Sequence, residues 1–233
     1  MTKRILRWTV LLLLMAVSAF AENHYCVTTE QGVYLVSESG NAIDFSAAWT
    51  DLYCIQENSL YAVGQNRSGK MLYALCDASG RFLTEPIYTS LAAQQNGVLF
   101  LLDGVYGWMD DQGDEQIPAD YTQMVGAGGN SFYAFLTDPN DDQADQIYLV
   151  DTANHSTPTG VWTILPLETV SDNRMPFCES GTAMYGYLDQ KGAIAIPAQF
   201  EYAGTFENGL ADAVENGLHG LIDTDGNWVL NHE

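Results

Sequence analysis

Apolar and polar residues alternate in short runs along the chain, and the clearest run is YGYLD, from Tyr185 to Asp189. Tyr185, Tyr187 and Asp189 fall on one side of this run, and Gly186 and Leu188 fall on the other. A period of two residues is typical of a β-strand. A glycine beside an aromatic residue in a strand indicates that another backbone or ring packs closely against it. Beyond residue 21 no segment has a persuasive helical period, so the pattern predicts an all-β fold.

An eight-residue phrase recurs along the chain, as YGWMDDQG at 106–113, YGYLDQKG at 185–192 and HGLIDTDG at 219–226. Shorter copies end at Gly80, at Gly40 with serine in place of the aspartate, and at Asn154 with asparagine in place of the glycine. The copies end at positions 40, 80, 113, 154, 192 and 226, which are 33–41 residues apart. A period in this range marks a repeat fold, here with about six units.

The D-x-x-G part of the phrase predicts a tight turn between two strands. Aspartate at the first position of a type I turn accepts a hydrogen bond from the backbone two residues further on. Glycine at the fourth position takes the left-handed conformation that closes the turn, and asparagine is the best substitute for it. The phrase therefore ends one strand and starts the next.

The second half of each unit is also patterned. A proline and then an aromatic residue follow the turn, as in Pro118 and Tyr121 or Pro197 and Phe200. A further strand then ends in a two-residue hairpin signal, such as Asn216-Gly217. Each unit is therefore predicted to be a three-stranded meander.

The two ends of the array suggest how the units are arranged. Residues 24–32 resemble the third strand of a unit, and the chain ends after a second strand at 227–233. The first strand would then complete the last unit, which predicts a propeller-like toroid with its ends latched. The alternative is an open β-superhelix, or solenoid, whose two ends act as caps.

These residues resemble the WG β-repeat (WG-containing repeat) family of bacterial proteins. Its repeats read G-[WYF]-[IL]-D-x-x-G, then an apolar strand with an Ile-Pro pair and an aromatic residue, then F-x-x-G-L-A-x-V and a closing glycine. Residues 185–226 follow this pattern nearly throughout, and residues 106–121 carry the tryptophan after the glycine. The family is defined by its repeat and not by a reaction. The resemblance therefore implies a binding function and no catalytic residues.

The first 21 residues read as a secretory signal peptide. Lys3, Arg4 and Arg7 precede a short apolar run at 8–17, and Ala19-Phe20-Ala21 is a small-x-small cleavage pattern. The alternative is an uncleaved anchor. Cleavage leaves residues 22–233, which we expect to form a single domain of WG-type β-repeats that is secreted or held in the cell envelope, without stable insertion in a membrane.

The chain is strongly acidic, with 8 Lys and Arg against 30 Asp and Glu and a formal net charge of −22. Loss of the three basic residues of the signal peptide leaves 5 against 30, a charge of −25. Such a surface repels nucleic acid and anionic lipid. It serves either solubility outside the cell or attraction of a basic partner.

The cysteines and one acidic loop are the candidates for bridges and for metal. Cys26, Cys54, Cys76 and Cys178 permit two disulfides in three pairings, or are buried thiols, and their spacing matches no zinc motif. Residues 138–145 place oxygen donors at Asp138, Asn140 and Asp142, but Gln143 and Leu149 stand where a calcium loop needs glycine and glutamate. A solvated loop without metal is therefore expected.

No catalytic motif occurs, since G-x-S-x-G, H-E-x-x-H, a Walker loop and G-x-G-x-x-G are absent from the sequence. We expect a protein that is not an enzyme and has no cofactor: a secreted scaffold that binds a protein or another macromolecule at or outside the cell surface. The alternatives are a cell-envelope carbohydrate-binding module and, less favoured, an exported hydrolase.

The binding residues are not identified by any motif. The recurring residues Tyr106, Trp108, Tyr185 and Tyr187 are interpreted as filling between units, because core positions recur in register. A binding face is expected instead on variable loops, at residues 65–69, 138–145 and 170–178.

Overall fold

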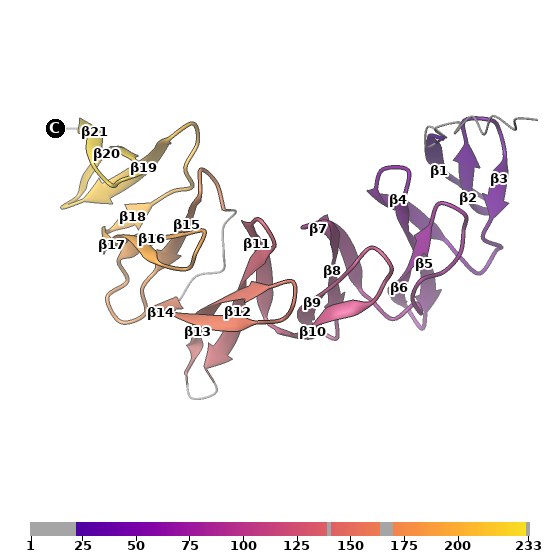
Figure 1. Ribbon diagram of the computed structural model, residues 1–233, viewed down its shortest axis with the longest axis horizontal. Helices are drawn as coiled ribbons and strands as arrows, with labels where there is room; N and C mark the ends of the chain where they lie inside the picture. Colours follow the sequence, from indigo (N-terminus) through magenta and orange to yellow (C-terminus); the bar gives the residue numbers. More distant parts are fainter. Residues whose placement is uncertain (1–21, 139–140, 164–169, 232–233) are drawn as a thin grey trace, which may run out of the picture.

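The structure is a computed structural model that describes residues 22–138, 141–163 and 170–231. In these three ranges the chain contains strands and no helix, and the strands form six separate antiparallel sheets (Figure 1). The prediction of an all-β fold with about six units is confirmed. The predicted signal peptide, residues 1–21, lies outside the described residues.

The first three sheets comprise residues 24–121. Sheet 1 contains β1 (His24–Thr29), β2 (Gly32–Ser37) and β3 (Ala42–Asp44). Sheet 2 contains β4 (Asp51–Gln56), β5 (Leu60–Arg67) and β6 (Lys70–Asp77). Sheet 3 contains β7 (Ser90–Gln94), β8 (Gly97–Leu102), β9 (Val105–Met109) and β10 (Glu115–Tyr121).

The last three sheets follow in chain order. Sheet 4 contains β11 (Gln123–Gly128), β12 (Ser131–Asp138), β13 (Asp141–Asp151) and β14 (Ser156–Thr163). Sheet 5 contains β15 (Arg174–Cys178), β16 (Tyr185–Asp189) and β17 (Ile194–Phe200). Sheet 6 contains β18 (Tyr202–Ala203), β19 (Leu210–Glu215), β20 (Leu218–Asp223) and β21 (Trp228–Asn231).

The six sheets are stacked face to face along an open arc (Figure 1). Each of the five contacts between neighbouring sheets has its own apolar cluster, so the protein has five thin cores in series. The cluster between sheets 5 and 6, for example, includes Tyr187, Ile196 and Phe200 from one sheet and Ala211 and Ile222 from the other. Alternate residues of one strand thus enter different cores, which explains the period of two in the sequence.

The repeated turns have the geometry that the D-x-x-G pattern predicts. The backbone N–H of the fourth residue donates to the first carbonyl at 2.9–3.1 Å in all six copies, which end at Gly40, Gly80, Gly113, Asn154, Gly192 and Gly226. Five of them begin with an aspartate, whose Oδ1 accepts from the backbone N–H groups two and four residues on at 2.8–3.1 Å. The fourth residue is left-handed, with φ between +61° and +86°, and the asparagine at 154 takes this conformation as well.

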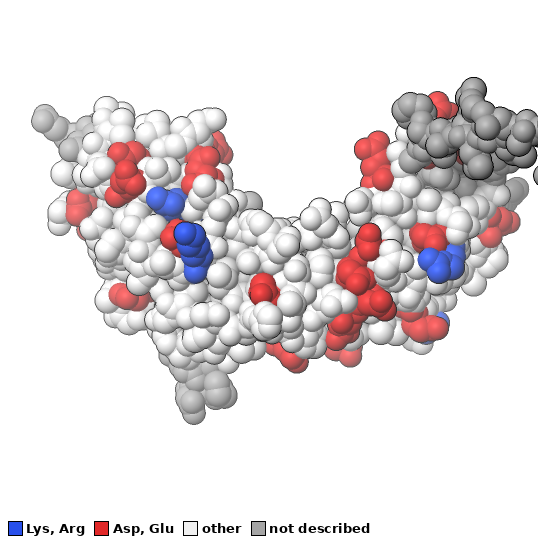
Figure 2. Space-filling model, in the orientation of Figure 1, with Lys and Arg blue, Asp and Glu red and all other residues white. Residues whose placement is uncertain are grey.

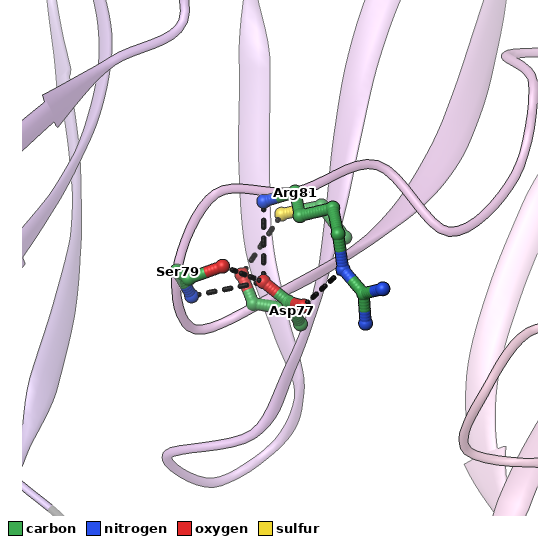
Figure 3. Close-up of polar contacts among 4 residues, drawn as sticks. Asp77, Ser79 and Arg81 are labelled. Atoms are coloured by element: carbon green, nitrogen blue, oxygen red, sulfur yellow. Dashed lines mark hydrogen bonds and ion pairs between the residues drawn. The ribbon is translucent and has the colours of Figure 1, made fainter.

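Figure 3 shows the turn at Asp77, whose carboxylate accepts from the backbone N–H and the hydroxyl of Ser79 and from the backbone N–H and Nε of Arg81. Burial, the largest single effect, raises the pKa of this carboxyl, but the hydrogen bonds from Ser79 and Arg81 together outweigh it and leave the pKa below its usual value. Hydrogen bonds, first of all from the backbone N–H four residues on, lower the pKa of Asp151 and Asp223.

The glycines beside the aromatic residues are close to other strands, as expected. A Cβ on Gly186 would lie 2.6 Å from the Ile196 carbonyl oxygen and 2.8 Å from Cζ of Phe177. Gly107 has the same position in sheet 3, where the Ile117 carbonyl oxygen would lie 2.6 Å from its Cβ. Glycine is therefore required where a ring from the neighbouring strand covers the backbone.

The predicted unit differs from the observed sheet in its phase and strand number. The predicted meander begins at the Gly-aromatic strand, such as β9 or β20. The observed sheets begin one or two strands earlier, because the strand before the hairpin pairs with the Gly-aromatic strand in the same sheet. Sheets 3, 4 and 6 have four strands and not three. Of their first strands, β18 has only two residues, so sequence periodicity does not reveal it.

The predicted latch between the two ends is wrong. Residues 24–29 form β1, which pairs with β2 inside sheet 1, so this strand does not complete sheet 6. Sheets 1 and 6 lie at opposite ends of the arc (Figure 1). Each end of the described chain is already a sheet of its own, and the open arrangement, the alternative in the sequence analysis, is the one observed.

Candidate functional site

A groove on the concave side of the arc has a volume of about 540 Å³. Four consecutive sheets contribute to it, because the inside of a curved stack is where the ends of neighbouring sheets converge. Its lining consists of Gln56, Ala93, Gln94, Gln95, Asn96, Gly97, Gly126, Ala127, Gly128, Val170, Asp172, Asn173 and Gln190.

Six of these side chains carry a carboxamide: Gln56, Gln94, Gln95, Asn96, Asn173 and Gln190. Each carboxamide offers both hydrogen-bond donors and an acceptor. Three glycines also line the groove, and two of them make room for the amides: a Cβ on Gly126 would collide with the Gln94 amide, and one on Gly128 would lie 2.6 Å from Nε2 of Gln190. The groove is therefore polar, open and built to present amides.

Hydrogen bonds hold several of these groups in place. Nε2 of Gln95, in sheet 3, donates to the Ser131 carbonyl of sheet 4 at 3.0 Å. Nε2 of Gln190 donates to Oδ1 of Asn173 at 2.6 Å. The Gln94 carbonyl accepts from Nε1 of Trp108 at 2.8 Å, so the buried indole supports the groove from below.

The turns before β5, β8, β15 and β19 share one feature. Each contains an asparagine in the left-handed conformation, with φ between +53° and +61°: Asn58, Asn96, Asn173 and Asn208. Such a conformation favours asparagine over larger residues. These turns also bridge neighbouring sheets: Asn58 Oδ1 accepts from the His24 backbone N–H, and Asp172 Oδ2 accepts from that of Gly209 at 2.7 Å.

The electrostatics of the groove differ from those of the surface around it. Asp172 is the only charged residue in its lining within the described part of the chain. Figure 2 shows few charged residues between the two arms of the arc, and acidic residues together with a few Lys or Arg side chains on the arms. The groove is thus a hydrogen-bonding surface with little charge of its own, beside a surface that is mainly acidic.

The structure brings one of the three predicted loops to this groove. Val170, Asp172 and Asn173, from the loop at 170–178, line it. Residues 65–69 form the β5–β6 hairpin and do not belong to the lining. Asn140 lies outside the described residues, and nothing is described of the side chains of Asp138 and Asp142. Strands β12 and β13 pair at Asp138 and Asp141, so the backbone there is a β-hairpin.

The recurring aromatic residues lie where the sequence interpretation puts them. Trp108 and Tyr187 are 5% and 0% exposed, each in the core between two sheets. Tyr106 and Tyr185 are half-buried and pack against the same cores. Neither pair lines the groove. The glutamines that do line it belong to no motif found in the sequence, although the recurrence of asparagine just before β5, β8, β15 and β19 is a readable signal.

All four cysteines are free thiols and form no bridge. The alternative expectation of buried thiols holds for Cys76 and Cys178, whereas Cys26 is partly buried and Cys54 is exposed. Cys54 and Cys76 flank Tyr61 in one row across sheet 2, and Cys26 of sheet 1 packs against the same core. Cys178 lies in sheet 5, so the fold does not bring two pairs together. Burial raises the pKa of Cys76 to about 12, and burial and then the Cys54 thiol raise that of Cys26 to about 11.

Among the residues that the structure describes, no group of three or more His, Cys, Asp or Glu side chains is arranged to hold a metal ion. None of the described segments is a helix with the length and apolar character needed to span a bilayer.

The likeness to one solved structure places this stack of sheets in the propeller-like class. A eukaryotic initiation factor matches with a TM-score of 0.52 and 9% identity, over 91% of this chain and 64% of that chain. The chain thus spans about two thirds of that relative, and the likeness concerns the fold alone. Kluyveromyces lactis Hsv2 matches with a TM-score of 0.45 and 7% identity, over 86% and 71% of the two chains. A nidogen/laminin complex matches with a TM-score of 0.41 and 9% identity, over 91% and 93%.

Within this class, the sequence identifies the repeat. Residues 185–218 match the family model described as WG containing repeat, so the chain carries a repeat of the WG family that its sequence resembles. The matched segment starts at β16 in sheet 5 and ends at β20 in sheet 6. One sequence repeat therefore begins inside one sheet and ends inside the next. No curated protein matches the chain.

Proposed function

We propose that this chain is an exported, non-catalytic scaffold that binds an extended segment of a partner protein in the amide-lined groove. The observation that carries the proposal is the set of carboxamides contributed by sheets 2, 3 and 5. An extended peptide presents N–H and C=O groups along its backbone, and carboxamides complement both kinds of group. A groove across several sheets has the length for such a strand-like ligand.

A peptide fits this lining better than a glycan does. Sugar sites in proteins commonly use an aromatic face beside their polar groups, and none of the described residues that line the groove is aromatic. Trp108 and Tyr187 belong to the cores between sheets and offer no such face. The acidic arms add a preference for peptides with Lys or Arg at their ends, because opposite charge speeds and orients association.

The test compares two matched arginine substitutions. Ala93 is an exposed residue of the groove, and Ala153 is an exposed residue of the turn at 151–154, outside the lining. A displayed library of random peptides is panned on the wild-type protein, and the recovered peptides are synthesised and titrated by fluorescence anisotropy. We expect Ala93→Arg to weaken binding at least tenfold and Ala153→Arg to leave it unchanged.

The same preparations are mixed with isolated cell-wall polysaccharide. Equal loss of peptide binding in both variants contradicts the peptide site. So does panning that recovers the same peptides on the wild-type protein and on Ala93→Arg. Polysaccharide binding that is lost only in Ala93→Arg would assign the groove to a glycan instead.

A further inference from the structure

The two ends of the arc leave two sheet faces uncovered. Six stacked sheets have five contacts between neighbours, and each contact has an apolar core. The rear face of sheet 1 and the forward face of sheet 6 therefore have no neighbouring sheet in the described chain. Both faces point outward at opposite ends of the arc (Figure 1).

The forward face of sheet 6 retains the residues of an internal contact. Leu230 stands four residues after its turn glycine, the position that Ile117 and Ile196 occupy in sheets 3 and 5. Those two isoleucines are 0% and 1% exposed under the next sheet, whereas Leu230 is 58% exposed. Leu221, its partner across β20 and β21, has the position of the buried Tyr187.

The rear face of sheet 1 retains the complementary residues. Strands β1 and β19 can be aligned at their hairpins, where Thr29 pairs with Gly32 and Glu215 pairs with Leu218. In this alignment Tyr25 and Val27 on β1 have the positions of Ala211 and Ala213 on β19. Ala211 and Ala213 are 2% and 1% exposed against sheet 5, whereas Tyr25 and Val27 are 54% and 36% exposed.

We propose that these two faces bind each other between copies of this chain, head to tail. In every internal contact the forward face of one sheet covers the rear face of the next, and the free faces are one of each kind. A second copy therefore supplies the surface that continues the established packing. The contact is heterologous, because different patches meet, and apolar burial drives it.

The test uses one charged substitution at each end and one between them. Leu230→Asp disables the forward face and Tyr25→Asp disables the rear face. Ile87→Asp, at an exposed apolar residue before sheet 3, is the control. Molar mass is measured by light scattering after gel filtration of protein produced from the full chain, and circular dichroism checks that each variant is folded.

We expect wild type and Ile87→Asp to have at least twice the mass of one chain, and each end variant to have the mass of one chain. An equimolar mixture of the two end variants is expected to form a two-chain species, because one intact face of each kind remains. A single-chain mass for wild type at high micromolar concentration overturns the proposal. So does a Leu230→Asp variant that still pairs with itself, because that result requires like faces to meet.

Discussion

Replacing Gly186 with alanine tests the account of the repeated Gly-aromatic strand. The new methyl group would lie 2.6 Å from the Ile196 carbonyl oxygen, 2.8 Å from the Ala198 nitrogen and 2.8 Å from Cζ of Phe177, where ordinary contacts begin at 3.4 Å. Two of these atoms are backbone and move only if the strands separate.

The cost follows from this crowding. Overpacking by one methylene costs about 1–3 kcal/mol, and alanine regains about 0.5–1 kcal/mol that glycine loses in a strand interior. We expect a net destabilisation of about 1 kcal/mol. In a protein of this size that corresponds to a fall in melting temperature of about 2–4 °C.

Sheet 2 supplies the internal comparison. Ala74 occupies the position of Gly186 there and is fully buried, opposite Val63 and not opposite a phenylalanine. The double variant Gly186→Ala with Phe177→Val recreates that pair. We expect the loss in free energy of unfolding of the double variant to be about 1 kcal/mol smaller than the sum of the losses in the two single variants.

The assay is urea unfolding followed by tryptophan fluorescence, with all four proteins of the cycle measured in parallel. An unchanged midpoint for Gly186→Ala would refute the steric account. Additive effects in the cycle, within about 0.5 kcal/mol, would show that the Phe177 ring is not what requires the glycine.

Two other predictions concern the turns. Asn154→Ala is expected to cost about 1–2 kcal/mol because alanine resists the left-handed φ of +61°, whereas Asn154→Gly should stay within about 0.5 kcal/mol; urea midpoints distinguish them. The lowered carboxyl pKa values of Asp77, Asp151 and Asp223 give stability that is fully present above pH about 4 and is lost as the pH falls through the folded-state values. Acid titration by circular dichroism should show a smaller loss for Asp77→Asn than for wild type, and equal losses would contradict the assignment.

Local chemistry in the sequence predicts the turns and the strands around them. The pairing of Asp189 with Gly192, or of Asp151 with Asn154, depends on residues within one turn, so no distant contact is needed to foresee it. The same holds for the close packing at Gly186, since a glycine next to Tyr185 already signals it.

The phase of the sheets and the groove depend on contacts between units. Periodicity cannot say whether β1 pairs forward with β2 or back with a distant strand, and loop closure between neighbours favours the local pairing. The groove joins Gln56, Gln94 and Gln190, which lie in three different sheets and in no shared motif. Their convergence follows from the curvature of the stack, which no single repeat encodes.

The difference in phase between the sequence repeat and the sheet has a consequence for how such a chain changes length. The matched repeat at 185–218 gives β16 and β17 to sheet 5 and β18 and β19 to sheet 6. Duplication of one such segment in the gene would supply the second half of one sheet and the first half of the next. The inserted halves join the existing ones into whole sheets, so the array lengthens by one sheet without creating an unpaired strand at either junction.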